Sequence, residues 1–423
     1  MLRAFINAFK IPDLRKKILF TLLVIAIYRL GSFLPLPNVD VQQLAASTGQ
    51  SGQQGFFSFI NLFSGGALTR LAVFALGIMP YITSSIIMQL LTVVIPKLEQ
   101  WQKQGEIGQK RITQWTRYMT VTLALIQSTG LLFLFNSQFQ GSIKSFTAPR
   151  IAFMVLILTA GTAMIMWLGE LITQRGIGNG MSMLIFTSVI SELPSQGYSI
   201  FQQGSLEFGV ILGIALLIIV AVVFMEQGQR RIPVQYAKRV VGRRMTQGGS
   251  TYIPLKVNQA GVIPIIFASS VLYFPTLLRS VVQWDWFRNI IDNHLLNQGS
   301  AVYIIVYGLL VVFFAYFYTA ISFNPNDTAD NIRKYGGFIP GIRPGKPTAD
   351  HLDHILTRIT LPGALFLATI ALIPSIALII LGIPTSTFPF GGTSVLITVG
   401  VALETMKQLE SQLTMRHYEG FIK

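Results

Sequence analysis

The chain has 423 residues, of which 52% are hydrophobic and only 12% charged, and its mean hydropathy is +0.57. Soluble domains typically contain about 25% charged residues, so a soluble monomer and a disordered chain are both excluded. A polytopic membrane protein is predicted instead. The net charge of +15 lies between apolar segments, which favours membrane topology over nucleic-acid binding as its cause. Because the chain has no cysteine, disulfides, thiolate nucleophiles and Cys-ligated metal centres are excluded.

Ten apolar segments predict an all-α polytopic membrane protein with ten transmembrane helices. They cover residues 18–34, 71–95, 118–136, 151–169, 179–193, 208–225, 261–278, 301–322, 359–382 and 391–410. If the amino terminus is cytoplasmic and the sides alternate, most of the 32 Lys and Arg residues fall on the cytoplasmic side. The loops on the other side hold only Arg70, Lys144, Arg150, Arg279 and Arg288. The positive-inside rule therefore places both termini in the cytoplasm.

Two features of the first third of the chain are unusual for a simple bundle. Arg29 lies inside the first span near its outer end, where its side chain is expected to snorkel to the interface. Between the first two spans, residues 56–68 are apolar but too short to cross a membrane, and Gly65-Gly66 would end a helix there. This segment is either a half-helix that folds back into a cavity as a stopper or a helix that lies flat at the interface.

The second and seventh spans carry related motifs. Residues 77–80 and 261–264 both read Gly, two apolar residues and Pro, and a pair of serines follows each of them. If each half contains five spans, the two motifs occupy equivalent positions, and the odd number forces the second half to be inverted. Paired Gly/Pro-interrupted segments in inverted halves point to a functional site at the repeat interface. The serines alone are also explained as contacts that hold membrane helices together.

Two long cytoplasmic loops, residues 226–260 and 323–358, are rich in Lys and Arg. The inside rule and contact with anionic lipid explain the sign of their charge. Neither effect explains the length of the two loops, and long loops are often functional. We therefore expect a docking role for at least one of them.

The spans lack the residues that transport or catalysis would require. Almost no ionisable residue lies at mid-membrane, which argues against a proton- or sodium-coupled carrier. The chain contains no H-E-x-x-H, G-x-S-x-G or phosphate-binding G-x-x-x-x-G-K-[ST] motif. We therefore expect no enzymatic activity, no cofactor, no metal site and no small-molecule substrate.

Several motifs in order resemble the SecY family, the channel-forming subunits of the Sec protein translocase, and the resemblance runs nearly end to end. They are residues 61–68 (NLFSGGAL), 75–82 (ALGIMPYI), 175–180 (RGIGNG), 228–232 (GQRRI), 236–239 (YAKR), 254–258 (PLKVN) and 340–345 (PGIRPG). Gln227 is a small departure, since relatives often carry Arg there; it leaves details of docking open.

The resemblance implies two inverted five-helix halves around a central hourglass pore. Residues 1–193 would form the half with spans one to five and a plug at 56–68, and residues 208–423 the half with spans six to ten and both long loops. The implied function is a passive gated channel, which translocates unfolded preproteins across the cytoplasmic membrane of a bacterium and releases transmembrane segments laterally into it. The alternative is a secondary transporter built on an inverted repeat, which the apolar spans disfavour.

The resemblance also implies a role for specific residues. The pore ring would be Ile78, Ile82, Ile185, Ile266 and Ile397. The plug would include Phe57, Ile60, Asn61, Phe63, Ser64, Gly65, Gly66 and Leu68. The polar seam of the lateral gate would be Thr83, Ser84, Gln127, Ser269 and Ser270. The residues that dock the motor or ribosome would be Arg243, Arg244 and Arg343.

The implied partners follow from the same resemblance. They are the small subunits SecE and SecG, the SecA ATPase motor, the ribosome, signal peptides and preproteins, and anionic lipid. Energy for movement would come from such a partner, because the chain has no nucleotide-binding motif of its own.

Overall fold

A computed structural model gives the fold of the chain. It describes residues 9–41, 44, 61, 63–139, 143, 146–236, 239–241, 244–246, 250–281, 284–295, 299–380, 382 and 391–419. The predicted plug residues Phe57 and Ile60 and the predicted docking residue Arg243 lie outside this part of the chain. Arg244 belongs to a described strand, but its side chain is not described.

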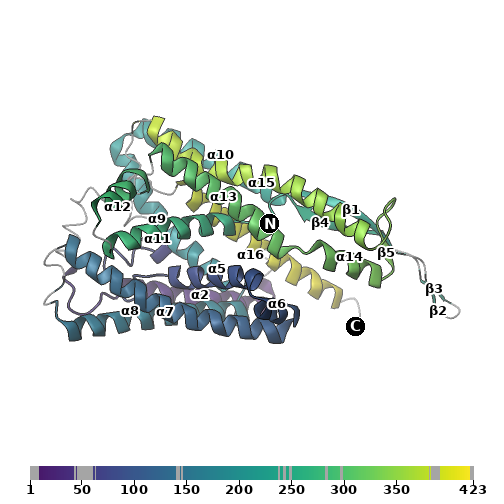
Figure 1. Ribbon diagram of the computed structural model, residues 1–423, viewed down its shortest axis with the longest axis horizontal. Helices are drawn as coiled ribbons and strands as arrows, with labels where there is room; N and C mark the ends of the chain where they lie inside the picture. The colour runs from purple at the N-terminus through teal and green to yellow at the C-terminus, as the bar shows by residue number, and fades with distance from the viewer. Residues whose placement is uncertain are drawn as a thin grey trace.

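Long helices make up most of the described chain, and they fall into two groups. The first group is α2 (Pro12–Phe33), α5 (Met79–Val94), α6 (Pro96–Lys103), α7 (Glu106–Gln138), α8 (Ala148–Arg175) and α9 (Gly180–Gln203). The second is α10 (Ser205–Gln227), α11 (Ile263–Val281), α12 (Asp285–Ile290), the π-helix η1 (Ile291–Leu295), α13 (Ala301–Ser322), α14 (Pro325–Lys334), α15 (Lys346–Ile380) and α16 (Gly391–Glu419). Figure 1 shows α2, α5, α7 and α8 together in its lower part and α10, α13 and α15 in its upper part.

Each of the ten predicted apolar segments overlaps one of these helices, so a polytopic helical membrane protein is confirmed. Among the described residues, five helices are long and apolar enough to cross a membrane, or six if the bent pair α5–α6 counts as one span. The number ten therefore stays a prediction. The α10 segment is only 11% buried, as expected of a helix that faces lipid.

The second predicted segment, 71–95, differs from the structure in its first third. Residues 71–78 form turns, and the helix begins only at Met79. Leu71 and Gly77 have positive φ angles of 43° and 56°, which no α-helix accommodates. The Leu36 backbone N–H donates to the Leu71 carbonyl at 2.9 Å, so the chain before α5 is tied to the end of α2. Irregular backbone at membrane depth is tolerated here because the protein buries it.

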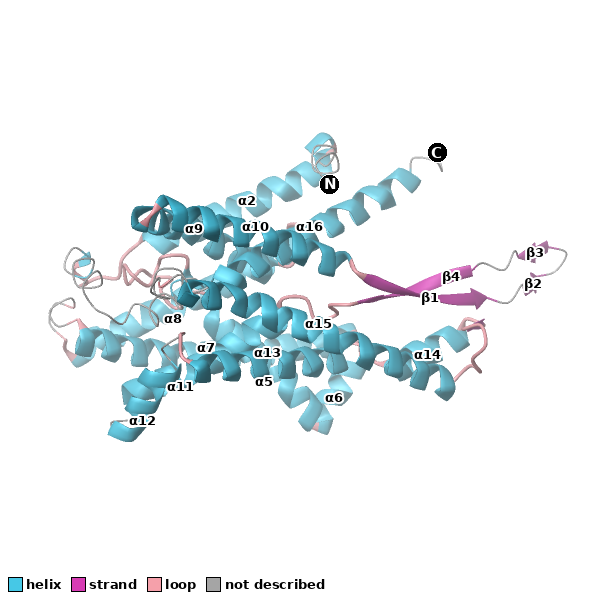
Figure 2. Ribbon diagram, turned by 90° about the horizontal axis from the view of Figure 1, so that it is seen from above, coloured by secondary structure: helices cyan, strands magenta, loops and turns pink. Residues whose placement is uncertain are grey.

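A small β-structure adds to the predicted helical fold. Strands β1 (Gln229–Tyr236) and β4 (Ser250–Lys256) pair antiparallel, and β5 (Gly337–Phe338) joins the other edge of β1. A second pair, β2 (Arg239–Val241) with β3 (Arg244–Thr246), lies beyond it. Figure 2 shows these strands projecting from one end of the bundle, the end at which α2 begins and α16 ends. In β1, Ile232 and Val234 are buried and their neighbours exposed, which is the alternation of a half-buried strand.

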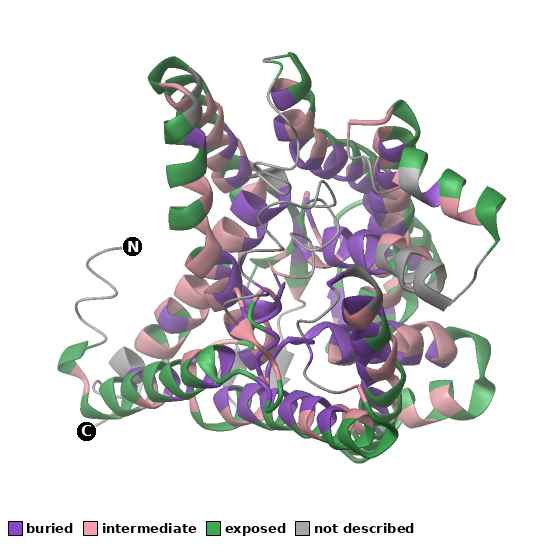
Figure 3. Cartoon of the chain, turned by 90° about the vertical axis from the view of Figure 1, so that its left-hand side faces the viewer, coloured by how far each residue is buried: buried purple, intermediate pink, exposed green. Residues whose placement is uncertain are grey.

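One hydrophobic cluster runs through the centre of the bundle and joins side chains of both helix groups. Figure 3 shows the buried residues on the inward faces of the helices and the exposed ones on the outward faces. The outward faces carry exposed Leu, Ile, Val and Phe, which a bilayer would cover. The core therefore lies where the two groups meet.

Candidate functional site

Five isoleucines at the centre of the bundle are the predicted pore ring. Each is at most 7% exposed, and all belong to the central hydrophobic cluster. They are Ile78, Ile82, Ile185, Ile266 and Ile397. They come from the start of α5, from α9, from α11 and from α16, so both helix groups contribute. A collar of aliphatic side chains offers no hydrogen bond to water or ions and closes a passage by dewetting.

Two adjoining cavities, of about 240 and 450 Å³, border the collar. The larger is lined by Ile82, Ile185 and Ile266, and the smaller by Ile185, Ile266 and Ile397. Along α16, Ile397 is followed seven residues later by Glu404, which also lines the smaller cavity about 10 Å nearer the strands. Both cavities therefore lie on the side of the collar that faces the strands, which the positive-inside rule predicts to be cytoplasmic.

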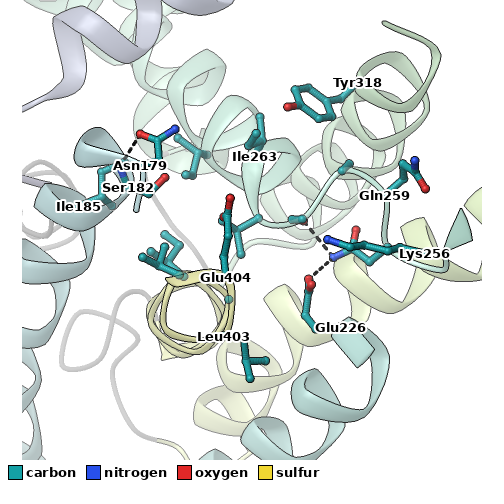
Figure 4. Close-up of a pocket in the computed structure, with 18 of the residues that line it drawn as sticks. Asn179, Ser182, Ile185, Glu226, Lys256, Gln259, Ile263, Tyr318, Leu403 and Glu404 are labelled. Carbon is teal, nitrogen blue, oxygen red and sulfur yellow. Dashed lines mark hydrogen bonds between the residues drawn. The ribbon is translucent and has the colours of Figure 1, made fainter. Parts of the chain in front are cut away.

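The wall of the smaller cavity mixes polar and aliphatic side chains from α9, α10, β4, α11, α13 and α16 (Figure 4). Asn258, in the turn before α11, donates its amide to the Glu226 carboxylate at 2.6 Å and to the Gly261 carbonyl at 3.1 Å. Lys407 of α16 donates to the backbone carbonyl of Glu226 at 3.1 Å. These bonds tie α10, the start of α11 and α16 together beside the collar.

The wall of the larger cavity holds a bidentate ion pair. Arg117 of α7 donates Nε and Nη2 to the two carboxylate oxygens of Glu170 on α8 at 2.7 and 2.6 Å. Bidentate guanidinium–carboxylate pairs are directional as well as strong. The pair thus fixes α7 against α8 beside the larger cavity.

The described part of the predicted plug is buried against the collar. Phe63, Ser64, Ala67 and Leu68 are at most 2% exposed, and Ile78 belongs to the same cluster as the apolar three. Ser64 caps its own turn, since its hydroxyl accepts from the Leu68 backbone N–H at 3.2 Å. The segment therefore sits inside the protein, which favours a stopper over a helix lying flat at the interface.

Glycines make the plug's fit possible. Gly65 and Gly66 have φ angles of 62° and 85°, a left-handed turn that few other residues adopt. Asn61 accepts the Gly66 backbone N–H at its carbonyl, at 3.3 Å. A Cβ on Gly77 would stand 2.7 Å from the Phe63 carbonyl oxygen, so the chain before α5 passes directly under the plug.

The predicted gate residues belong to α5, α7 and α11, and α11 packs against both of the other helices in a seam. Most of their hydroxyls bond back to their own helices: Thr83 to Met79, Ser84 to Pro80 and Ser270 to Ile266, at 2.8–2.9 Å. Ser269 instead pairs with Tyr307 of α13 at 3.3 Å. The buried Oε1 of Gln127 has no partner. Among the described residues, no hydrogen bond crosses from α5 or α7 to α11.

The described parts of the two long basic loops, 226–260 and 323–358, form one folded unit. Ile232 and Val234 of β1 and Leu255 of β4 pack against Ile332 of α14 and Leu352 at the start of α15. Arg343 is exposed beside this core, in a turn that the Thr348 hydroxyl fixes by donating to the Arg343 carbonyl at 2.9 Å. This bond fixes the backbone at Arg343, and the docking roles of Arg343 and Arg244 both stay predictions.

The comparisons with known proteins agree with this geometry. The sequence model of the SecY family matches residues 72–406. The chain belongs to the SecY family. The protein translocase subunit SecY of Streptomyces coelicolor is 55% identical over 442 residues, and that of Mycobacterium tuberculosis is 52% identical over 443 residues. In both cases 100% of each chain is covered.

Solved structures show the same fold at lower sequence identity. A protein-conducting channel matches with a TM-score of 0.64 at 17% identity and 96% coverage of both chains. A SecY channel matches with a TM-score of 0.63 at 17% identity, also with 96% coverage of both chains. Its plug domain is described as stabilising the closed state and maintaining a membrane seal. The channel of the canine ribosome–channel complex from the endoplasmic reticulum matches at 0.62 and 16%, with 96% of both covered. At these identities the likeness shows the fold alone.

Sequence reasoning missed the polar contacts that hold the site. Arg29 was expected to snorkel, but its guanidinium bonds to the Gly65 carbonyl. The pair Arg117–Glu170 and the contact of Glu226 with Asn258 were also missed. The sequence did contain one signal for these contacts. A charged residue in or next to an apolar span normally pairs with another polar group, so a partner should have been sought for each of them.

Proposed function

We infer that the chain is a gated, passive channel that conducts unfolded polypeptide across a membrane and releases apolar segments sideways into it. One observation carries this conclusion: buried isoleucines from both helix groups border two cavities, and a buried plug segment belongs to the same hydrophobic cluster. A carrier would instead need a polar cage around its substrate at mid-membrane.

Opening follows from the chemistry of the cargo. A signal sequence is an apolar helix, so it gains free energy by passing from the aqueous cavity into lipid. Its binding in the seam between α5 and α11 would favour the open state, because a ligand shifts an equilibrium by its differential affinity. The absence of crossing hydrogen bonds among the described seam residues supports this route.

The halves of the channel are residues 1–193, with the plug at 56–68, and residues 208–423, with the cytoplasmic loops at 226–260 and 323–358. Related Gly/Pro motifs at 77–80 and 261–264 support an inverted repeat. The collar of five isoleucines, the gate seam and the plug take the roles given above.

The folded cytoplasmic unit is the proposed docking surface for the force-generating partner. Its charge is positive and its exposed Arg343 is held in a fixed turn, which suits an anionic RNA or acidic protein surface. A ribosome is one such partner, and the canine relative is a ribosome–channel complex. The ATPase motor SecA, the small subunits SecE and SecG, and anionic lipid complete the set, in a bacterial cytoplasmic membrane with both termini inside.

The test is the ion conductance of the purified chain in planar bilayers, wild type against a deletion of residues 57–68. A silent wild type and a leaky deletion are expected. If both are silent, the segment is not a seal or no continuous pore exists, and the secondary transporter returns as the better explanation. ATP hydrolysis by the purified chain alone would contradict a passive channel.

A further inference from the structure

A single arginine joins the plug to the N-terminal helices. Arg29 of α2 donates from Nη1 to the Gly65 carbonyl at 2.7 Å and to the Ser191 hydroxyl of α9 at 2.9 Å. The Ser191 hydroxyl donates onward to the Ser188 carbonyl at 2.7 Å, which fixes its orientation. Two helices and the plug therefore meet at one guanidinium.

The glycine turn of the plug is seated directly on this arginine. A Cβ on Gly65 would lie 2.9 Å from Arg29 Nη1 and 3.1 Å from Ser188 Cα. A Cβ on Gly66 would lie 2.8 Å from the carboxylate of Glu192 on α9. The bare backbone thus brings the Gly65 carbonyl within reach of the guanidinium.

The surface beneath the turn is rigid. The Tyr28 hydroxyl of α2 pairs with the Ser188 hydroxyl of α9 at 2.6 Å, and the Tyr28 ring, wholly buried, stacks on Phe74 at 5.9 Å. All of these residues belong to α2, to α9 or to the turns before α5, and none belongs to the second helix group. Separation of the seam between α5 and α11 therefore leaves the contact of Arg29 with Gly65 intact.

We propose that Arg29 is a positioning residue of the seal, which holds the plug shut through its hydrogen bond to the Gly65 carbonyl. The inference rests on the proposed plug function, since it assigns the plug's seat to one contact. Hydrogen bonds from a charged donor are stronger than neutral ones, and a low-dielectric setting strengthens them further. Arg29 also lies close to the outer end of α2, so its guanidinium reaches interfacial water when the bond breaks. The contact is therefore both firm and reversible.

The test compares idle conductance in planar bilayers for Arg29→Met, the deletion of 57–68 and a matched control. Arg70 is that control, because its guanidinium stacks at 4.3 Å on the same Phe33 ring that Arg29 approaches at 5.2 Å. Loss of a charge-assisted bond predicts a rise of about tenfold or more for Arg29→Met. Arg70→Met should stay silent, and Arg29→Lys, which keeps a cationic donor, should stay close to wild type.

The three conductance measurements separate the role of Arg29 from the role of the plug. A leaky deletion with a silent Arg29→Met overturns the role of Arg29 and leaves the proposed channel standing. A silent deletion refutes the plug itself, and the role of Arg29 with it. A leak in Arg70→Met equal to that in Arg29→Met means that any lost charge loosens the bundle, and this also overturns the proposal.

A second readout follows the plug directly. The chain has no cysteine, so Ala67→Cys introduces a single thiol at a wholly buried plug position. A membrane-impermeant maleimide should label it at least about tenfold faster when Arg29→Met is added. The control thiol, Ala364→Cys in α15, is 1% exposed and should stay protected. Equal labelling of Ala67→Cys with and without Arg29, or fast labelling of both thiols, contradicts the proposal.

Discussion

Replacement of Gly77 by alanine should unseat the plug although the plug's own sequence stays unchanged. Gly77 has a φ of 56°, and a Cβ there would stand 2.7 Å from the Phe63 carbonyl oxygen and 3.0 Å from Ser64 Cα. Both atoms belong to the plug's backbone, so no side-chain rotation relieves the clash. The left-handed conformation costs an L-residue about 1–2 kcal/mol, and overpacking adds about 1–3 kcal/mol.

When the plug leaves its seat, the overpacking cost is relieved but the backbone cost at Gly77 remains. The clash therefore favours the unseated plug by about 1–3 kcal/mol, which raises the ratio of unseated to seated plug by about 5- to 140-fold. Gly105→Ala is the matched control, because Gly105 has a φ of 69° but no atom within 4 Å of its added Cβ. The control variant therefore carries a backbone cost in the turn before α7 but no clash with the plug.

The assay is idle conductance in planar bilayers, beside a thermal unfolding curve of each protein. Gly77→Ala should leak and Gly105→Ala should not, although both unfold at a lower temperature than wild type. A well-folded Gly77→Ala protein that is as tight as wild type would refute the reasoning, as would equal leaks in both variants.

Three further outcomes follow from single contacts. Arg343→Gln should weaken binding of the motor or ribosome several-fold in a flotation assay with proteoliposomes, while Lys346→Gln, three residues on, should change it less; equal effects would mean that only net charge matters. Tyr28→Phe removes the bond to α9 and should lower the unfolding free energy by about 1 kcal/mol; an unchanged melting temperature would contradict this. Glu170→Gln should cost about 1–3 kcal/mol because it leaves Arg117 without its carboxylate, and Arg117→Met in the same background should recover part of the loss.

The sequence predicted the helices well because their apolar runs are long. It failed at 71–78, where apolar composition is the same but positive φ angles at Leu71 and Gly77 break the helix. It also ended the fifth helix at 193, whereas α9 continues through Pro194 to Gln203. Composition reports burial in lipid or protein alike, so it does not separate a helix from a buried irregular segment.

The apolar part of the candidate site was accessible to sequence reasoning because family motifs mark it. Its polar contacts were not, since they join residues far apart in the chain. Arg29 and Gly65 are 36 positions apart, and Arg117 and Glu170 are 53. A single sequence gives no pairing of this kind, and the sheet that joins residues 229–256 to residues 337–338 could not be predicted for the same reason.

The most direct test of the channel asks whether polypeptide passes through the collar. In the cysteine-free chain, single cysteines replace Ile82 or Ile266 of the collar, or Leu217 of α10, which is 66% exposed toward lipid. A secretory precursor with one cysteine is stalled in transit in proteoliposomes that hold the chain, its membrane partners and the motor, and disulfide formation is measured. Cross-links from Ile82→Cys and Ile266→Cys but not from Leu217→Cys are predicted. Cross-links from Leu217→Cys alone, or equally from all three, would contradict a central polypeptide pore.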